Sequence, residues 1–215
     1  MDSDELPLVG GHPALDLVNT VERGAPAAGG EPPDHLADPP ALLRWAGRAG
    51  LVDGTEARAV ADSWERDPAS GPAALAAVRD VREALHTILL AAMGVGPPGD
   101  GDRADAALER LRNRWAAAAA RSRLALDPGR AAARLTVGTE PGSLIADRVA
   151  AGAVELLRDA ELARLRRCPP DAGGCGWVFL DRSRNGSRRW CRMADCGTTV
   201  KARRLTERRR AARAR

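Results

Sequence analysis

The four cysteines are the feature that most constrains how this chain can fold. All of them lie within 29 residues near the end of a 215-residue sequence, and the 167 residues before them contain none. Their spacing is C-x6-C-x15-C-x4-C, with Cys168 and Cys175 as one close pair and Cys191 and Cys196 as the other. Two close pairs joined by a longer loop can converge on a tetrahedron, so the spacing predicts one bound zinc ion.

Four thiolates would fill the coordination shell of zinc and leave no open position, which predicts a structural rather than a catalytic ion. The neighbouring residues Pro169, Pro170, Gly173 and Gly174 favour the tight turns that such a site needs. Three alternatives stay open on the spacing alone: an iron–sulfur cluster, a disulfide-based redox switch, and ordinary reduced cysteines.

Charge is divided unevenly along the chain. Residues 161–215 contain 16 Lys and Arg against 5 Asp and Glu, a net of +11, whereas residues 1–160 contain 17 against 24, a net of −7. This asymmetry predicts an acidic body and a cationic C-terminal part that binds nucleic acid, although a solvated basic tail would have the same composition.

No apolar stretch approaches the roughly 18 residues of a membrane span. The opening residues Met1 to Glu5 do not have the pattern of a signal peptide. We therefore expect a cytoplasmic protein without a membrane partner. Thiols stay reduced in the cytoplasm, which favours metal binding over disulfides.

The body of the chain is predicted to be mainly α-helical. Aromatic residues make up only 3% of the sequence, so the core must rest on Leu, Val and Ala, which suit packed helices. Helix periodicity and capping signals predict helices over 12–21, 39–50, 55–66, 72–93, 102–120 and 144–157, and a small β-hairpin over 123–126 and 134–137. We therefore predict an α-rich domain at 1–160 and a four-cysteine zinc module with a basic helix at 161–215.

Within the module, residues 176–181 alternate bulky side chains and predict a strand, and Asn185-Gly186 predicts a turn. Asp181 is expected to pair with an arginine of the following loop. Thr198 or Thr199 is expected to cap a basic helix over 200–212. The candidate nucleic-acid contacts are Arg182, Arg184, Arg188, Arg189, Lys201, Arg203 and Arg204. As an alternative, the loop arginines bridge to the acidic body.

The segment from Phe179 through Ser183-Arg184-Asn185-Gly186-Ser187-Arg188-Arg189-Trp190-Cys191 to Lys201 resembles the CGNR-type zinc finger of bacterial proteins. The opening Gly11-His12-Pro13-Ala14-Leu15-Asp16-Leu17-Val18-Asn19-Thr20 resembles the start of the ABATE domain, which usually precedes that finger. The resemblance implies a stress-related transcription regulator with a sensing domain, a DNA-binding finger, and zinc ligands at Cys168, Cys175, Cys191 and Cys196. The finger's Cys-Gly-Asn-Arg reads Cys196-Gly197-Thr198-Thr199 here, so its arginine cation is absent at that position.

Three polar residues interrupt the apolar N-terminal segment: His12, Asp16 and Asn19. Their helical spacing puts them on one face, where they could line a ligand pocket. The alternative is that Asp16 and Asn19 satisfy buried backbone groups or caps. We find no nucleophile elbow, phosphate loop or catalytic triad in the sequence, so we do not expect an enzyme.

These observations lead to a two-part regulator that holds one structural zinc, binds DNA and responds through its N-terminal domain to a small-molecule effector or stress signal. Two other functions stay open. The module could instead dock on an acidic protein, including a second copy of the chain in a homodimer, or it could be a thiol switch that loses zinc on oxidation. RNA could replace DNA as the partner.

Overall fold

The computed structural model describes residues 6–24, 32–95, 101–126, 129, 132–159, 162–198, 200–202 and 206. The chain divides into two compact units. The helical unit consists of Met1–Leu6 and His35–Leu162, and the cysteine unit consists of Pro7–Asp34 and Ala163–Arg215. The N-terminal segment therefore groups with the cysteine-containing part of the chain and not with the helices that follow it in sequence.

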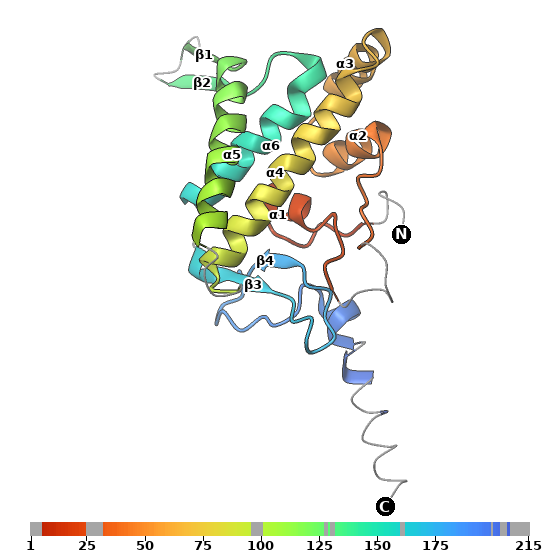
Figure 1. Cartoon of the computed structure of the whole chain (residues 1–215), viewed down its shortest axis with the longest axis vertical. Coiled ribbons are helices and arrows are strands. Elements are labelled where there is room, and N and C mark those ends of the chain that lie inside the picture. The colour runs from red at the N-terminus through yellow and green to blue at the C-terminus, as the bar shows by residue number, and fades with distance from the viewer. Residues whose placement is uncertain are drawn as a thin grey trace, which may run out of the picture. The chain divides into compact units, whose positions relative to one another are not determined.

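The helical unit contains five α-helices among its described residues (Figure 1). They are α2 (Pro39–Arg48), α3 (Gly54–Arg66), α4 (Ser70–Ala92), α5 (Gly101–Ala120) and α6 (Leu144–Asp159), the last preceded by a 3-10 turn at Pro141–Ser143. A second 3-10 turn spans Leu162–Arg164. The predicted mainly α fold is confirmed. None of the described helices is both long and apolar enough to cross a membrane.

Capping explains where two of these helices begin. At α2 the Asp38 carboxylate accepts a hydrogen bond of 2.7 Å from the Ala41 amide, and Pro39 is the first helical residue, as predicted. The next helix begins at Gly54, one residue earlier than predicted, and its cap is Asp53. Asp53 accepts from the amides of Thr55 and Glu56, and the Glu56 carboxylate accepts from the Asp53 amide, which completes a capping box.

The core of the helical unit lies among α4, α5 and α6, which pack on one another, with α2 against α4. Leu85 of α4, Ile145 of α6 and Trp45 of α2 are buried. One charged pair lies at the edge of this core: Arg121 donates to buried Asp147 through Nε at 2.9 Å and Nη2 at 2.5 Å. The pair fixes the end of α5 against the first turn of α6.

The predicted hairpin follows α5. Strand β1 (Arg123–Leu126) pairs antiparallel with β2 (Ala133–Thr136), with Arg123 opposite Thr136. All eight residues are exposed. The hairpin contributes no buried side chain to the core.

The cysteine unit contains a short helix, a two-stranded hairpin and a helical turn. Helix α1 spans Pro13–Val18, strand β3 (Leu165–Arg167) pairs antiparallel with β4 (Val178–Leu180), and a π-helical turn spans Met193–Gly197. The strand predicted over 176–181 is confirmed. The amide of Leu180 donates to the Gly10 carbonyl at 2.9 Å, so the segment before α1 lies against the free edge of β4.

Candidate metal centre

The β3–β4 hairpin positions the first pair of cysteines. Cys168 follows β3 directly, and its amide and carbonyl continue the hairpin with Trp177 and Gly176 at 2.8 and 3.1 Å. The chain between the two cysteines turns tightly, with the Gly174 amide donating to the Pro169 carbonyl at 2.8 Å. Gly173 and Gly176 take φ values of +91° and +79°, which residues with a side chain rarely adopt. The predicted glycine-rich turn thus brings Cys175 back beside Cys168.

The second pair lies around the π-helical turn. Cys191 ends the arginine-rich loop, and Cys196 lies within the turn. Gly197 follows with no room for a side chain, because a Cβ atom there would lie 2.3 Å from the Met193 sulfur and 3.3 Å from the Trp190 ring. The absence of a side chain lets Met193 and Trp190 pack against this turn.

The four sulfur atoms converge. All lie within 4.8 Å of one another, with Cys175 to Cys191 at 3.3 Å and Cys191 to Cys196 at 3.7 Å. A tetrahedral four-thiolate zinc site has sulfur atoms about 3.8 Å apart. A Cβ at Gly174 would lie 2.6 Å from the Cys168 sulfur, so the backbone there closes tightly around the ligand. No two of the four cysteines form a disulfide.

Crowding changes the acidity of the thiols. Hydrogen bonds from Cys175 and Cys191 lower the pKa of Cys168. The pKa values of Cys175 and Cys191 are raised, first because each shares a hydrogen bond with Cys168, and further because both are buried. A cluster of this kind cannot hold four negative charges by itself. A divalent cation offsets the repulsion among the thiolates, and zinc is a divalent cation that binds thiolate sulfur. The four cysteines therefore form the site of one structural zinc ion.

Asp181 organises the loop between the two pairs. Its carboxylate is buried and accepts from the amides of Ser183 and Arg188 at 2.9 and 2.8 Å. Hydrogen bonds from Ser183 and the Arg188 amide lower its pKa. The prediction of a loop-holding role is thus met through backbone amides, and no ion pair of Asp181 with a loop arginine is seen among the described residues. The turn predicted at Asn185-Gly186 is present, with Gly186 at φ +58°.

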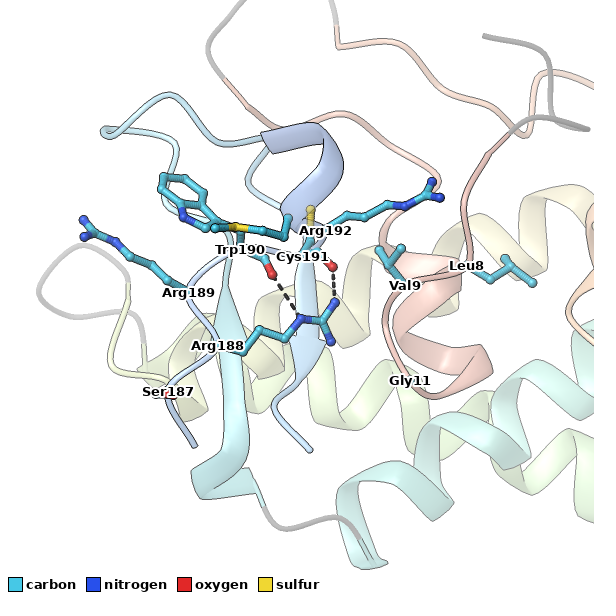
Figure 2. A pocket seen from close by; sticks show the side chains of 10 residues that line it. Leu8, Val9, Gly11, Ser187, Arg188, Arg189, Trp190, Cys191 and Arg192 are labelled. Atoms are coloured by element: carbon cyan, nitrogen blue, oxygen red, sulfur yellow. Dashed lines mark hydrogen bonds between the residues drawn. The ribbon is translucent and has the colours of Figure 1, made fainter. Parts of the chain in front are cut away.

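Arg188 points inward, unlike its neighbours. Its Nε donates to the Trp190 carbonyl at 3.0 Å, its Nη2 donates to the Cys191 carbonyl, and its guanidinium lies 4.4 Å from the centre of the Phe179 ring. Figure 2 shows this side chain turned towards the backbone that carries Cys191. Arg188 therefore donates to the backbone at the zinc ligand Cys191 and at the residue before it. The sequence did not indicate this arrangement.

The other predicted nucleic-acid contacts are exposed where the structure describes them. Arg182, Arg184, Arg189 and Lys201 are all exposed. The guanidinium of Arg189 lies 5.5 Å from the centre of the Trp190 ring. Arg203 and Arg204 lie outside the described residues, as does most of the predicted helix over 200–212.

The predicted cap at Thr198 was wrong. Thr198 has helical backbone angles, and its hydroxyl donates to the Met193 carbonyl at 3.0 Å instead of accepting from an amide ahead of it. The reason is that a helical turn at Met193–Gly197 precedes it, so Thr198 lies at the C-terminal end of that turn and not ahead of a first helical residue. Thr199 lies outside the described residues.

The three polar residues of the N-terminal segment bond to backbone groups. His12 Nδ1 accepts from the Ala14 amide at 3.1 Å, and the Asp16 carboxylate accepts from the Gly10 amide at 2.8 Å. Burial raises the pKa of Asp16 to about 6, against the opposing effect of hydrogen bonds from the Gly10 and Val9 backbone. Asn19 donates to the Val178 carbonyl and accepts from the Val178 amide, both at 2.9 Å. These contacts correspond to the backbone-satisfying alternative, and the ligand pocket at these residues stays a prediction.

The close approach between the N-terminal segment and the cysteine hairpin was not predicted from the sequence. A Cβ at Gly24 would lie 3.1 Å from the Cys175 carbonyl oxygen, and one at Gly176 would lie 2.9 Å from the Arg23 carbonyl oxygen. Two glycines therefore let the N-terminal backbone run directly beside a zinc ligand. In the sequence, Gly24 begins a Pro/Gly-rich stretch, which is typical of a loop. That pattern does not indicate which part of the chain the loop lies against.

Two family models match this chain. The model for ABATE, described as "Putative stress-induced transcription regulator", matches residues 11–160. The chain belongs to the ABATE family. The CGNR zinc finger matches residues 164–209. No curated protein matches the chain. The ABATE match begins within the segment that packs beside Cys175, so the start of the ABATE region and the CGNR finger form one compact unit.

Proposed function

We propose that this ABATE-family protein is a transcription regulator whose cysteine unit binds DNA through the arginine loop that the zinc site holds in place. The observation that supports this most is the separation of roles among the loop arginines. Arg188 faces inward, whereas Arg182, Arg184 and Arg189 are exposed and have no hydrogen bond or ion pair with any described residue.

Exposed arginines without acidic partners are suited to phosphate. Guanidinium groups bind phosphate oxygens in a bidentate manner, and each contact releases counterions from the nucleic acid. The loop that carries these arginines is fixed at both ends, by the Asp181 carboxylate on one side and by Cys191 on the other. A loop backbone that is held in place loses less conformational entropy on binding than a solvated tail does.

The helical unit carries the second part of the proposal. Its family description refers to stress induction, and we assign it the response to a signal, either a small-molecule effector or a change in the state of the cell. Regulation of this kind would operate in the cytoplasm, and a homodimer would let two cysteine units bind two half-sites. A zinc site with four protein ligands has no open position for a substrate, which supports a structural role for the zinc in binding.

Anisotropy of a fluorescent DNA duplex, titrated with zinc-loaded protein at several salt concentrations, tests DNA binding. We expect affinity to fall steeply with salt and to be lost after chelation of the metal. Arg184→Ala should weaken binding to all sequences and reduce the magnitude of the salt slope by about 1. Arg112→Ala is the matched control, because Arg112 is an exposed arginine of α5 that pairs with Glu109. Zinc-loaded protein that leaves the duplex unbound at low salt would refute the proposal and favour an acidic protein partner.

A further inference from the structure

A pocket of about 740 Å³ opens on the cysteine unit, beside the second pair of cysteines (Figure 2). The segment before α1 forms one wall through Leu8 and Val9, and the loop from Ser187 to Met193 forms the rest. Figure 2 shows Trp190 and Arg189 extending to one side of Arg188, with Val9 and Leu8 on the other. Leu8 and Met193 are 37% and 53% exposed, so two large apolar side chains line the pocket where it meets solvent.

A second pocket of about 350 Å³ shares Ser187, Arg188 and Arg189 with the first. It is lined by Arg166, Arg167 and Arg189 among others. The Nη1 of Arg166 donates to the carbonyls of Ala163 and Leu165, both at 2.8 Å, which fixes the side chain and leaves its other nitrogens available. A pocket that contains a flat indole and the apolar side chains of Leu8 and Met193 thus adjoins a pocket that adds two further arginines, and Ser187–Arg189 line both.

A nucleotide combines groups that suit both parts of this site. Its base is flat and largely apolar on its faces, which suits the indole, and its phosphate is anionic, which suits the arginines. We propose that the larger pocket takes one unpaired nucleobase, stacked against the indole of Trp190, while the flanking phosphates contact Arg189 and Arg166. The guanidinium of Arg189 lies 5.5 Å from the centre of the Trp190 ring, and Arg189 lines both pockets. It is therefore placed to contact a phosphate next to the stacked base. Base–aromatic stacking contributes about 1–3 kcal/mol per base.

This inference rests on the proposed nucleic-acid binding and makes it more specific. Bases in an intact duplex are stacked on one another and cannot enter a pocket, so the cysteine unit should prefer single-stranded or looped nucleic acid to a duplex of the same sequence. An acidic peptide would satisfy the arginines but would leave the indole of Trp190 and the thioether of Met193 without a matching flat partner.

The test compares a labelled 12-nucleotide thymidine strand with a duplex that contains it, each titrated by anisotropy with the zinc-loaded full chain. We expect tighter binding of the single strand. Trp190→Ala should weaken single-strand binding about 5- to 150-fold and leave the salt slope unchanged, because stacking neutralises no phosphate. A uridine strand in a parallel titration distinguishes RNA from DNA as the source of the base.

Trp190 lies next to a zinc ligand, so two further variants guard against misfolding. Trp190→Phe keeps an aromatic ring and should retain most of the affinity, and Leu8→Ser changes the opposite wall and should weaken single-strand binding several-fold. Each variant must keep one zinc per chain. Leu108→Ala, an exposed apolar residue of the helical unit, serves as the control.

Salt-dependent duplex binding with no effect of Trp190→Ala or Leu8→Ser on the single strand would overturn the stacking site and leave the proposed function standing. Failure to bind either nucleic acid would overturn both. Trp190-dependent binding of a poly-glutamate peptide, with neither nucleic acid bound, would likewise overturn both.

Discussion

Arg188 and Arg189 are adjacent in sequence and have opposite roles. Arg188 donates to the carbonyls of Trp190 and Cys191 and lies over Phe179, whereas Arg189 is exposed. Both were predicted to contact nucleic acid, because a run of arginines in a loop has no periodicity that would show which side chain faces inward. The cysteine spacing, by contrast, was enough to predict the metal site, because it limits the geometry of the ligands directly.

Replacing each arginine should separate the two roles. We expect Arg188→Ala to lower zinc affinity about 10-fold, because it removes support from the backbone of the ligand Cys191. Arg188→Lys should restore little of that affinity, since an ammonium group cannot reproduce the planar contacts. Arg189→Ala should leave zinc affinity unchanged. Competition with a chromophoric chelator measures these affinities, and equal losses in Arg188→Ala and Arg189→Ala would contradict the assignment.

At the scale of elements, one carboxylate connects three parts of the helical unit. Glu56 completes the capping box of α3, and it also pairs with Arg148 of α6, whose Nη1 donates to the Leu51 carbonyl as well. The hydrogen bonds from Arg148 lower the pKa of Glu56 from 4.5 to about 2. The first turn of α3 and the body of α6 are therefore held together by charge as well as by packing.

Glu56→Gln removes the charge and keeps an acceptor for the Asp53 amide. We expect it to lower the free energy of unfolding at pH 7 by about 1–2 kcal/mol, less than the pKa shift alone implies, because a third of the side chain is exposed and solvent screens the pair. The folded-state pKa is depressed, so this contribution is fully present above pH 4.5 and is lost as the pH falls towards 2. Urea unfolding of both proteins at pH 7, 4.5 and 3 measures it. A difference that stayed constant across that series would argue against the ion pair.

Local signals predicted most elements of the helical unit, and the errors have local causes. The Asp38-Pro39 pair marked the start of α2 correctly because Pro39 excludes an earlier helical residue. The start of α3 was predicted at residue 55, one residue late, because the capping box between Asp53 and Glu56 was not recognised. Thr198 was misjudged because a π-helical turn has no recognised sequence pattern, so the helical stretch begins before the predicted cap.

At the scale of the whole molecule, the cysteine unit is assembled from two segments that are far apart in sequence. Asn19 and Val178 are 159 positions apart and exchange two hydrogen bonds. No local pattern in either segment indicates the other, which is why the sequence could not identify Val178 as the partner of Asn19. The partners of His12 and Asp16 are local, at Ala14 and Gly10.

Removal of zinc should therefore affect both segments together. We expect chelation to increase amide hydrogen exchange over 7–24 and 163–198 while α4, α5 and α6 keep their protection, because zinc supplies much of the folding free energy of a unit with few apolar residues of its own. Mass spectrometry of exchanged peptides measures this, and re-addition of zinc is the control. Unchanged exchange over 7–24 in the metal-free protein would show that the N-terminal segment is held by other contacts.

The two-segment construction also sets an order for folding during synthesis. The helical unit is complete once the ribosome has released residue 162, but the first segment of the cysteine unit then still lacks the hairpin that it packs against. Asn19 and the backbone around Gly24 can reach their partners only after Val178 and Cys175 have emerged from the ribosome. The long stretch of chain between the two segments must then close into a loop. Because Cys175 and Val178 precede Cys191 and Cys196 in the chain, the N-terminal segment can meet its hairpin before the last two zinc ligands have emerged.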